Sequence, residues 1–222
     1  MFVKICGATT EREVRAVAEA GADLVGLWHG VPGGRADLSA QRLARLAAEA
    51  RATGRLRSVL VTFGSQAQTL ARTAADSGID WIQLHGYQRP ALVRALRARL
   101  PARVRLVKVL HVRGTSCPEA SLIKAYERAG TDLFLLDAAT ADGRVGSTAH
   151  PLDDRTAAGL AQSMTRPFLL AGGLRPDNRH RFGLVLAHPR FRGIDVDSAA
   201  RGGTGLVDGA RTADVVRAWR AP

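Results

Sequence analysis

Short apolar runs alternate with longer helix-forming stretches about eight times along the chain, and this repeat constrains the fold more than any other feature. The runs are nearly continuous in Val, Ile, Leu and Phe, so both faces of each predicted strand are buried. Such strands, separated by helices, are typical of a parallel sheet covered by helices. The predicted strands are residues 2–6, 23–27, 57–63, 81–84, 104–109, 133–136, 168–170 and 193–196.

A helix is predicted after each strand, and several carry start signals. Thr10 and Glu13 form a capping box, Ser39 is an N-cap and Pro90 is a first-turn proline. The predicted helices end near residues 20, 52, 77, 100, 129, 163, 186 and 218.

About eight strand–helix units in 222 residues match the size of a compact α/β protein of the (β/α)8 TIM barrel class. A doubly wound open sheet is the alternative. That fold is typically accompanied by a glycine-rich dinucleotide turn after the first strand, whereas Gly7 stands alone there. No linker or shift in composition divides the chain, so we expect one domain over residues 1–222.

The net charge of +12 comes almost entirely from arginine, since Lys4, Lys108 and Lys124 are the only lysines. The arginines are scattered over predicted helix faces, and aromatic residues make up only 5% of the chain. Base stacking would therefore have few platforms, so we expect no nucleic-acid partner and a small anionic ligand instead.

Two further features concern the compartment. No stretch is apolar enough to span a bilayer and no basic-then-apolar leader opens the sequence, so we expect no membrane partner. Two cysteines, Cys6 and Cys117, cannot build a disulfide framework. They fit a reducing, cytoplasmic environment.

In a (β/α)8 barrel the site lies at the carboxyl ends of the strands. The candidates there include Cys6, His85 and Asp137. A cysteine at this place is also compatible with simple burial, and His85 with a structural role. Asp137 follows four apolar residues, so its carboxylate needs a partner or a task. No His, Cys and carboxylate cluster has metal-ligand spacing, so we expect no metal.

Gly172 and Gly173 end the seventh predicted strand and would let an anion approach backbone N–H groups. A helix predicted to open at residues 175–178 would add free N–H groups and a positive dipole end. We interpret the segment as a phosphate or carboxylate seat, and the alternative is an ordinary tight turn.

Five motifs in order resemble the phosphoribosylanthranilate isomerase family of tryptophan biosynthesis over nearly the whole chain. They are Lys4-Ile5-Cys6-Gly7, Gln83-Leu84-His85-Gly86, Leu136-Asp137, Ala171-Gly172-Gly173-Leu174 followed by Pro176-Asp177-Asn178, and Gly193-Ile194-Asp195-Val196. The resemblance implies a (β/α)8 isomerase that converts an aldosamine into a ketosamine by an Amadori rearrangement without a cofactor.

By the same resemblance, Cys6 is the general base at the sugar C2 and Asp137 the general acid at the ring oxygen. Arg35 falls where the family's arginine meets the anthranilate carboxylate. Other candidate substrate contacts are Lys4, His85 and Asp195, and the phosphate seat comprises Gly172, Gly173 and Ser198. The implied partner is an anionic sugar phosphate, and we expect a monomer or a homodimer.

The sequence departs from the family pattern near the site. Tyr87 replaces an acidic residue, Asp197-Ser198-Ala199 replaces Ser-Ser-Gly, and Arg201 replaces an acidic residue. The loop at 143–151 also lacks the usual ending. Asp197 would repel a phosphate dianion unless Arg201 or another arginine offsets it. Alternatives are therefore a divergent paralogue that acts on a different sugar-amine, or as a lyase or epimerase in specialised metabolism, and a non-catalytic binding module.

Overall fold

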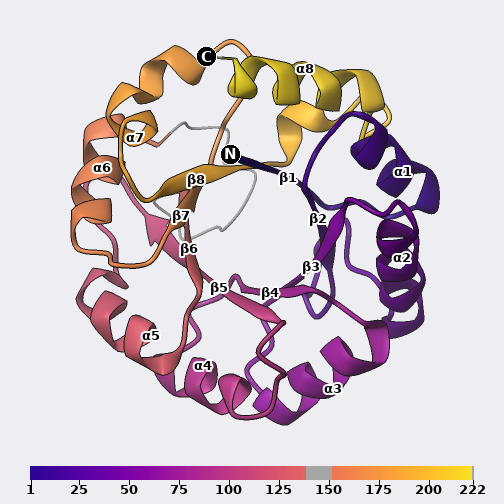
Figure 1. Cartoon of the computed structure of the whole chain (residues 1–222), viewed down its shortest axis with the longest axis horizontal. Coiled ribbons are helices and arrows are strands. Elements are labelled where there is room, and N and C mark those ends of the chain that lie inside the picture. The colour runs from indigo at the N-terminus through magenta and orange to yellow at the C-terminus, as the bar shows by residue number, and fades with distance from the viewer. Residues whose placement is uncertain (139–151, 222) are drawn as a thin grey trace.

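Eight parallel strands close into one barrel in chain order, from β1 round to β8 (Figure 1). The computed structural model describes residues 1–138 and 152–221. The closed sheet confirms the predicted TIM barrel and excludes the open doubly wound sheet. The strands are β1 (Phe2–Cys6), β2 (Leu24–Trp28), β3 (Arg57–Thr62), β4 (Trp81–Leu84), β5 (Arg105–Val112), β6 (Leu133–Ala138), β7 (Phe168–Leu170) and β8 (Phe191–Val196).

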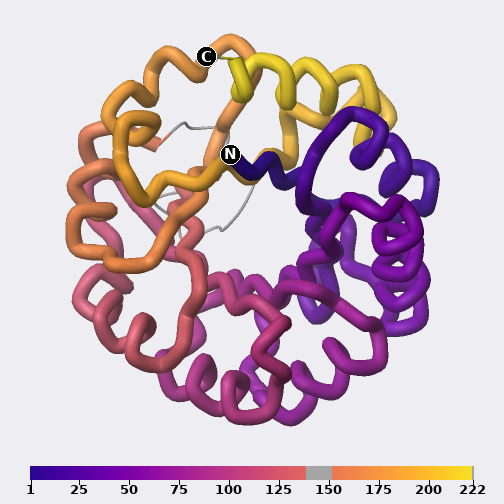
Figure 2. Tube along the Cα trace, in the orientation of Figure 1, coloured from indigo at the N-terminus to yellow at the C-terminus, as the bar shows by residue number. Residues whose placement is uncertain are grey.

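Pairing between the first and last strands closes the barrel. Four residues of β1, from Phe2 to Ile5, pair in register with Gly193 to Val196 of β8. Figure 2 shows the indigo start of the chain running beside the segment that carries β8. This pairing places the end of β1 beside the end of β8, although almost the whole chain separates them.

Helices surround the sheet on its outer face (Figure 1). The predicted N-caps are confirmed, because Thr10 accepts a hydrogen bond from the Glu13 N–H and Ser39 accepts one from the Arg42 N–H. The return bond of the Thr10–Glu13 capping box differs, since the Glu13 carboxylate accepts from the Thr9 N–H at 2.9 Å. The helices are α1 (Glu11–Glu19), α2 (Ala40–Ala52), α3 (Ala67–Ser77), α4 (Pro90–Arg97), α5 (Ile123–Ala129), α6 (Asp154–Gln162), α7 (Gly183–Leu186) and α8 (Gly209–Arg220).

The apolar side chains form two layers, one inside the barrel and one between the strands and the helices. The outer layer contains most of the buried Val, Leu and Ile side chains. The inner layer is smaller and includes Cys6, Val59, Val109, Leu135 and Ala171. Alternate residues of each strand therefore serve the two layers. Among the described residues, no helix has the length and apolarity needed to span a bilayer.

Several predicted boundaries differ from the structure, among them those of β5 and α5. Strand β5 continues to Val112 because its end pairs with β6 as far as Ala138. The helix predicted to end near residue 129 begins as a short 3-10 turn, Ala120–Leu122, before α5. The first difference places His111 inside β5, where its ring contacts the Glu119 carboxylate and the carbonyl oxygen of His85.

The helix predicted from residue 176 is also wrong. Residues 175–178 form a turn, a 3-10 helix covers Arg179–Phe182, and α7 has only four residues. The buried Asn178 side chain accepts a hydrogen bond from the Arg175 N–H at 2.8 Å and donates one to the Gly173 carbonyl at 2.9 Å. These bonds satisfy the backbone locally and delay the helix.

Candidate active site

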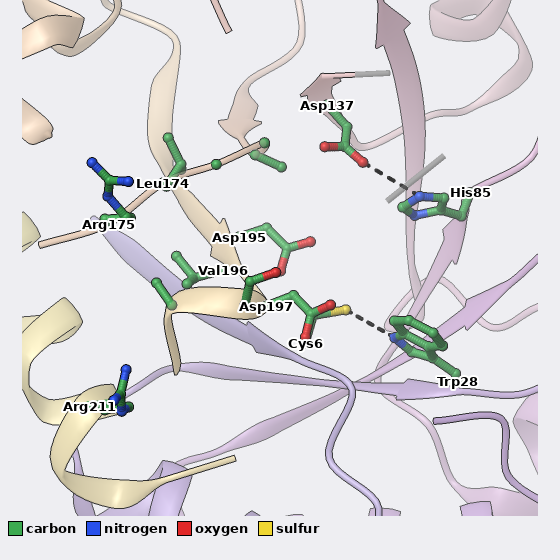
Figure 3. Close-up of a pocket in the computed structure, with 15 residues that line it drawn as sticks. Cys6, Trp28, His85, Asp137, Leu174, Arg175, Asp195, Val196, Asp197 and Arg211 are labelled. Atoms are coloured by element: carbon green, nitrogen blue, oxygen red, sulfur yellow. Dashed lines mark hydrogen bonds and ion pairs between the residues drawn. The ribbon is translucent and has the colours of Figure 1, made fainter. Parts of the chain in front are cut away.

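A cavity of about 330 Å³ opens at the carboxyl ends of the strands, where the barrel argument places a site (Figure 3). It brings together seven of the nine residues proposed from sequence: Cys6, His85, Asp137, Gly172, Gly173, Asp195 and Ser198. Lys4 lies buried beneath it, and Arg35 reaches its rim through Asp197. The altered loop residues 143–151 lie outside the described residues.

Lys4 is a buried cation held between a carboxylate and a thiol. Its ammonium nitrogen is 2.7 Å from Asp195 Oδ2 and 3.2 Å from Cys6 Sγ. Lys4 and Cys6 are two residues apart on β1 and so point to the same face, and the sheet register aligns Lys4 with Asp195. Burial by itself lowers the pKa of Lys4, but Asp195 and Cys6 outweigh it and the net pKa is raised. Lys4 therefore stays protonated beside the thiol.

The Cys6 thiol has a second donor that the sequence argument missed. Trp28, the last residue of β2, donates its indole N–H to Cys6 Sγ at 3.2 Å (Figure 3). Burial raises the pKa of Cys6 to about 12, although Lys4 and Trp28 act in the opposite direction. The thiol is therefore protonated without a ligand, and the two donors are positioned to stabilise a thiolate once it forms.

Asp137, the penultimate residue of β6, carries an almost fully buried carboxyl group. Burial, together with the charge of Asp195, raises its pKa to about 7, against a smaller lowering by Lys4. The raised pKa keeps Asp137 partly protonated at neutral pH. A carboxyl group with this pKa can donate a proton at neutral pH.

His85 lies between Gln83 and Asp137. Its Nδ1 is 2.9 Å from the Gln83 amide nitrogen, and its Nε2 is 3.5 Å from Asp137 Oδ2 (Figure 3). Because the amide nitrogen only donates, Nδ1 accepts and Nε2 carries the proton. Burial, with the nearby cations as smaller causes, lowers the pKa of His85 well below its ordinary value. A neutral imidazole thus directs an N–H at Asp137.

Gly172 and Gly173, the predicted anion seat, line the cavity. Gly172 and Gly173 adopt φ values of +88° and +62°, which few other residues tolerate. Because residues 175–178 form a turn, the helix dipole predicted directly after the two glycines does not form. Two cationic side chains line the same cavity, namely Arg175 in this turn and Arg211 in the first turn of α8.

Asp197 is neutralised by two arginines. Its Oδ1 is 2.6 Å from Arg201 Nε, and its Oδ2 is 2.6 Å from Arg35 Nη2. The buried Arg201 also donates to the carbonyl oxygens of Cys6 and Gly7. The sequence required that Arg201 or another arginine offset the charge of Asp197, and both arginines do so.

Asp195 has one further polar atom to satisfy. Its Oδ1 is buried and has no hydrogen-bond partner among the described residues. Buried polar atoms in native proteins are nearly always paired, so an unpaired one beside a cavity points to a ligand. Within the described part of the chain, no cluster of three His, Cys, Asp or Glu side chains is arranged to hold a metal ion.

Three site residues were not among the sequence candidates. Trp28 directly follows the predicted second strand, so its strand-end position was a usable signal. Gln83 lies two residues before His85 on the same predicted strand, so the sequence already indicated that the two side chains share a face. Arg211 gave no signal, since it is one of many arginines on helices.

Comparisons with known proteins agree with this geometry. A family model described as N-(5'phosphoribosyl)anthranilate (PRA) isomerase matches residues 3–218. The N-(5'-phosphoribosyl)anthranilate isomerase of Afipia carboxidovorans is 35% identical over 99% of this chain and 87% of its own length.

Two solved structures are similar along the full barrel. TrpF from Jonesia denitrificans is 30% identical, with a TM-score of 0.74 over 99% of this chain and 97% of that one. A phosphoribosyl anthranilate isomerase in complex with reduced 1-(o-carboxyphenylamino)-1-deoxyribulose 5-phosphate is 22% identical, with a TM-score of 0.75 over 99% and 98% of the two chains. At that identity the second similarity concerns the fold alone.

Proposed function

Because the chain belongs to the N-(5'-phosphoribosyl)anthranilate isomerase family, we propose that Cys6 and Asp137 move the protons in its Amadori rearrangement. The reaction converts an N-ribosyl amine into the corresponding ketose in tryptophan biosynthesis. One observation carries the proposal. A thiol held by two N–H donors and a carboxyl group with a pKa of about 7 line the same cavity.

Asp137 acts first as the acid. It gives its proton to the ring oxygen, the bond from C1 to that oxygen breaks, and the amine nitrogen lone pair forms an iminium with C1. His85 directs its N–H at Asp137 and stabilises the carboxylate that remains.

Cys6 acts second as the base. Its thiolate takes the C2 proton, the C2–H electrons form the C1–C2 double bond, and the iminium electrons return to nitrogen. The enaminol then tautomerises as C1 gains a proton and the C2 hydroxyl loses one. The substrate is isomerised with no net oxidation, so the chemistry needs no cofactor. The Cys6 thiol loses its own proton to solvent before this step and returns to its protonated resting form when it takes the C2 proton. Proton exchange with solvent restores the Asp137 acid.

The thiolate draws on two sources of positive charge. The Lys4 ammonium carries a permanent positive charge 3.2 Å from the sulfur. The iminium intermediate is transient and forms only after ring opening. Together they oppose the burial that raises the pKa of Cys6 to about 12. Formation of the thiolate is thus favoured at the step that needs it.

The remaining residues bind the substrate. Gly172, Gly173 and Ser198 offer backbone N–H groups to the phosphate, with Arg211 as an added cation. The unpaired Asp195 Oδ1 accepts a hydrogen bond from a sugar hydroxyl. Arg35 binds the carboxylate of the amine, as a guanidinium fork suits a carboxylate.

We also propose a cytoplasmic monomer or homodimer that acts on an anionic sugar phosphate and binds no nucleic acid. Both cysteines are unpaired thiols, which fits a reducing compartment. Many arginines are already engaged in ion pairs with carboxylates of the same molecule, so the charge of +12 is dispersed rather than gathered on one face.

The test is turnover of phosphoribosylanthranilate by purified protein, together with rescue of growth in a strain that lacks this isomerase. Cys6→Ser and Asp137→Asn should each fold and each lose roughly 10²–10⁴-fold in turnover, because each removes one proton-transfer group. Cys117→Ser is the matched control. It replaces the only other cysteine, which does not line the cavity, and should keep the parent rate. Near-parent turnover by the Cys6 or the Asp137 variant would refute the acid–base assignment.

A further inference from the structure

An ion pair joins Arg35 to Asp197 at the rim of the cavity. Arg35 lies between β2 and α2, and Asp197 directly follows β8, so 162 residues separate them in sequence. The Arg35 side chain is 49% exposed, whereas that of Asp197 is 17% exposed and lines the cavity. The residue proposed to bind the substrate carboxylate therefore already holds a carboxylate of its own chain.

We infer that Asp197 sets the amine specificity of this enzyme by relaxing its requirement for a carboxylate on the amine. The inference rests on the proposed function, in which Arg35 binds that carboxylate. Asp197 keeps its ion pair with Arg35 when the amine has no carboxylate. When the amine has a carboxylate, Arg35 leaves Asp197 and pairs with that carboxylate. Position 197 is one of the places where this chain departs from the family pattern, so the effect belongs to this chain.

The selectivity of a binding site depends on the binding free energy that it loses when a substrate group is missing. A binding site rejects an analogue strongly when one of its own polar groups is left unpaired by that analogue. Here the analogue leaves Arg35 paired with Asp197 at 2.6 Å, so little is lost. A carboxylated amine must exchange one carboxylate for another, so it gains only the difference between the two pairings. The enzyme therefore discriminates only weakly between an amine that carries a carboxylate and one that does not.

The exchange requires little rearrangement. Asp197 keeps its other oxygen on Arg201 at 2.6 Å, so it stays neutralised when Arg35 leaves. Arg201 is buried and is fixed by the carbonyl groups of Cys6, Gly7 and Gly205. Only the half-exposed Arg35 has to move, and its long side chain makes that movement easy.

The experiment compares two phosphorylated product analogues by calorimetry. One is reduced 1-(o-carboxyphenylamino)-1-deoxyribulose 5-phosphate, and the other is the same compound without the ring carboxyl group. The measured quantity is the ratio of their dissociation constants. Both analogues carry the phosphate, so any change in phosphate affinity caused by altering Asp197 cancels in the ratio.

The parent protein should favour the carboxylated analogue by less than roughly tenfold, since Arg35 only changes partner. Asp197→Ser should raise this preference by roughly tenfold or more, because Arg35 then no longer has the Asp197 carboxylate in place of the ligand carboxylate. Asp197→Asn keeps an acceptor for Arg201 and should shift the ratio in the same direction, which guards against a folding defect in the serine variant. Arg35→Ala should bring the ratio near one, with or without the change at position 197.

An unchanged ratio in both folded Asp197 variants would overturn the inference. A rise of the same size in the Arg35→Ala background would also overturn it, because the effect would then not pass through Arg35. The proposed function fails in a different way, namely by absent turnover of phosphoribosylanthranilate while the ratios still shift as expected. Failure of both analogues to bind any variant would refute both statements.

Discussion

At the scale of single residues, burial acts in the same direction on Cys6 and Asp137, the two groups proposed to transfer protons. The anion of a thiol and the anion of a carboxyl group each lose hydration in the enclosed cavity, so both pKa values rise. The pKa of Cys6 reaches about 12 and that of Asp137 about 7. For Asp137 the rise creates an acid that works at neutral pH. For Cys6 it means that the base appears only when Lys4 and a cationic intermediate oppose the burial.

Asp137 should therefore reduce the stability of the folded protein at neutral and alkaline pH. Its pKa is about 7 in the folded protein and 3.8 ordinarily, so the folded state favours the protonated form. The stabilising contribution is complete below pH 3.8 and is lost as the pH rises through 7. That difference corresponds to about 4 kcal/mol of unfolding free energy, of which about 3 kcal/mol falls between pH 5 and pH 8.5.

Urea unfolding of the parent and of Asp137→Asn at those two pH values tests this. The asparagine variant should gain about 3 kcal/mol relative to the parent as the pH rises, because it has no carboxylate to ionise. Asp177→Asn, at an exposed carboxylate, is the control and should show no such gain. Parallel pH dependence in the parent and Asp137→Asn would show that Asp137 ionises as easily as a surface carboxylate.

At the scale of the strands, the position of the Cys6 thiol depends on a glycine in the neighbouring strand. The register of β1 and β2 places Cys6 opposite Gly26. A methyl group on Gly26 would lie 2.7 Å from Cys6 Sγ and 3.0 Å from Lys4 Nζ. Both contacts are closer than carbon makes without displacement. The strand pair therefore provides the space in which the thiol meets its cation.

Gly26→Ala should fold and lose roughly 10–100-fold in turnover, since small misplacements of a reacting group cost rates of that order. The thiol is the group that must shift, so the loss should appear in kcat more than in KM. Gly183→Ala, where an added methyl meets nothing within 4 Å, should behave as the parent does. A parent-like kcat in Gly26→Ala would mean that the position of Cys6 is not critical.

The same scale explains what could be predicted from the sequence. Strand ends placed Cys6 and Asp137 at one mouth because parallel strands in a barrel end together. The helix predicted from residue 176 was wrong because one buried side chain, Asn178, supplies hydrogen bonds that a helix would otherwise make. Arg35 and Asp197 are 162 residues apart in sequence, and closure of the barrel brings their segments together. No local pattern specifies their pairing.

At the scale of the whole molecule, the barrel closes where β1 meets β8. Phe2 pairs with Gly193 at the amino-terminal end of this seam, and Cys6 lies at its other end. Gly193 has a φ of +151°, and a methyl group there would lie 1.9 Å from the Phe2 carbonyl oxygen. The obstacle is backbone, so no side-chain movement relieves it. The seam therefore tolerates only glycine at this position.

Gly193→Ala should lower the free energy of unfolding by at least about 2–4 kcal/mol, from steric overlap and backbone strain together. Because the seam joins the first strand to the last, the loss should appear in one cooperative transition, with circular dichroism and tryptophan fluorescence falling together. Gly159→Ala in α6 meets nothing within 4 Å and should stabilise the protein by about 0.5–1 kcal/mol through helix propensity. Equal melting temperatures for the two variants would mean that the β1–β8 seam adapts to an added side chain. A normal kcat in folded Gly193→Ala at low temperature would separate closure of the barrel from the chemistry at its opposite end.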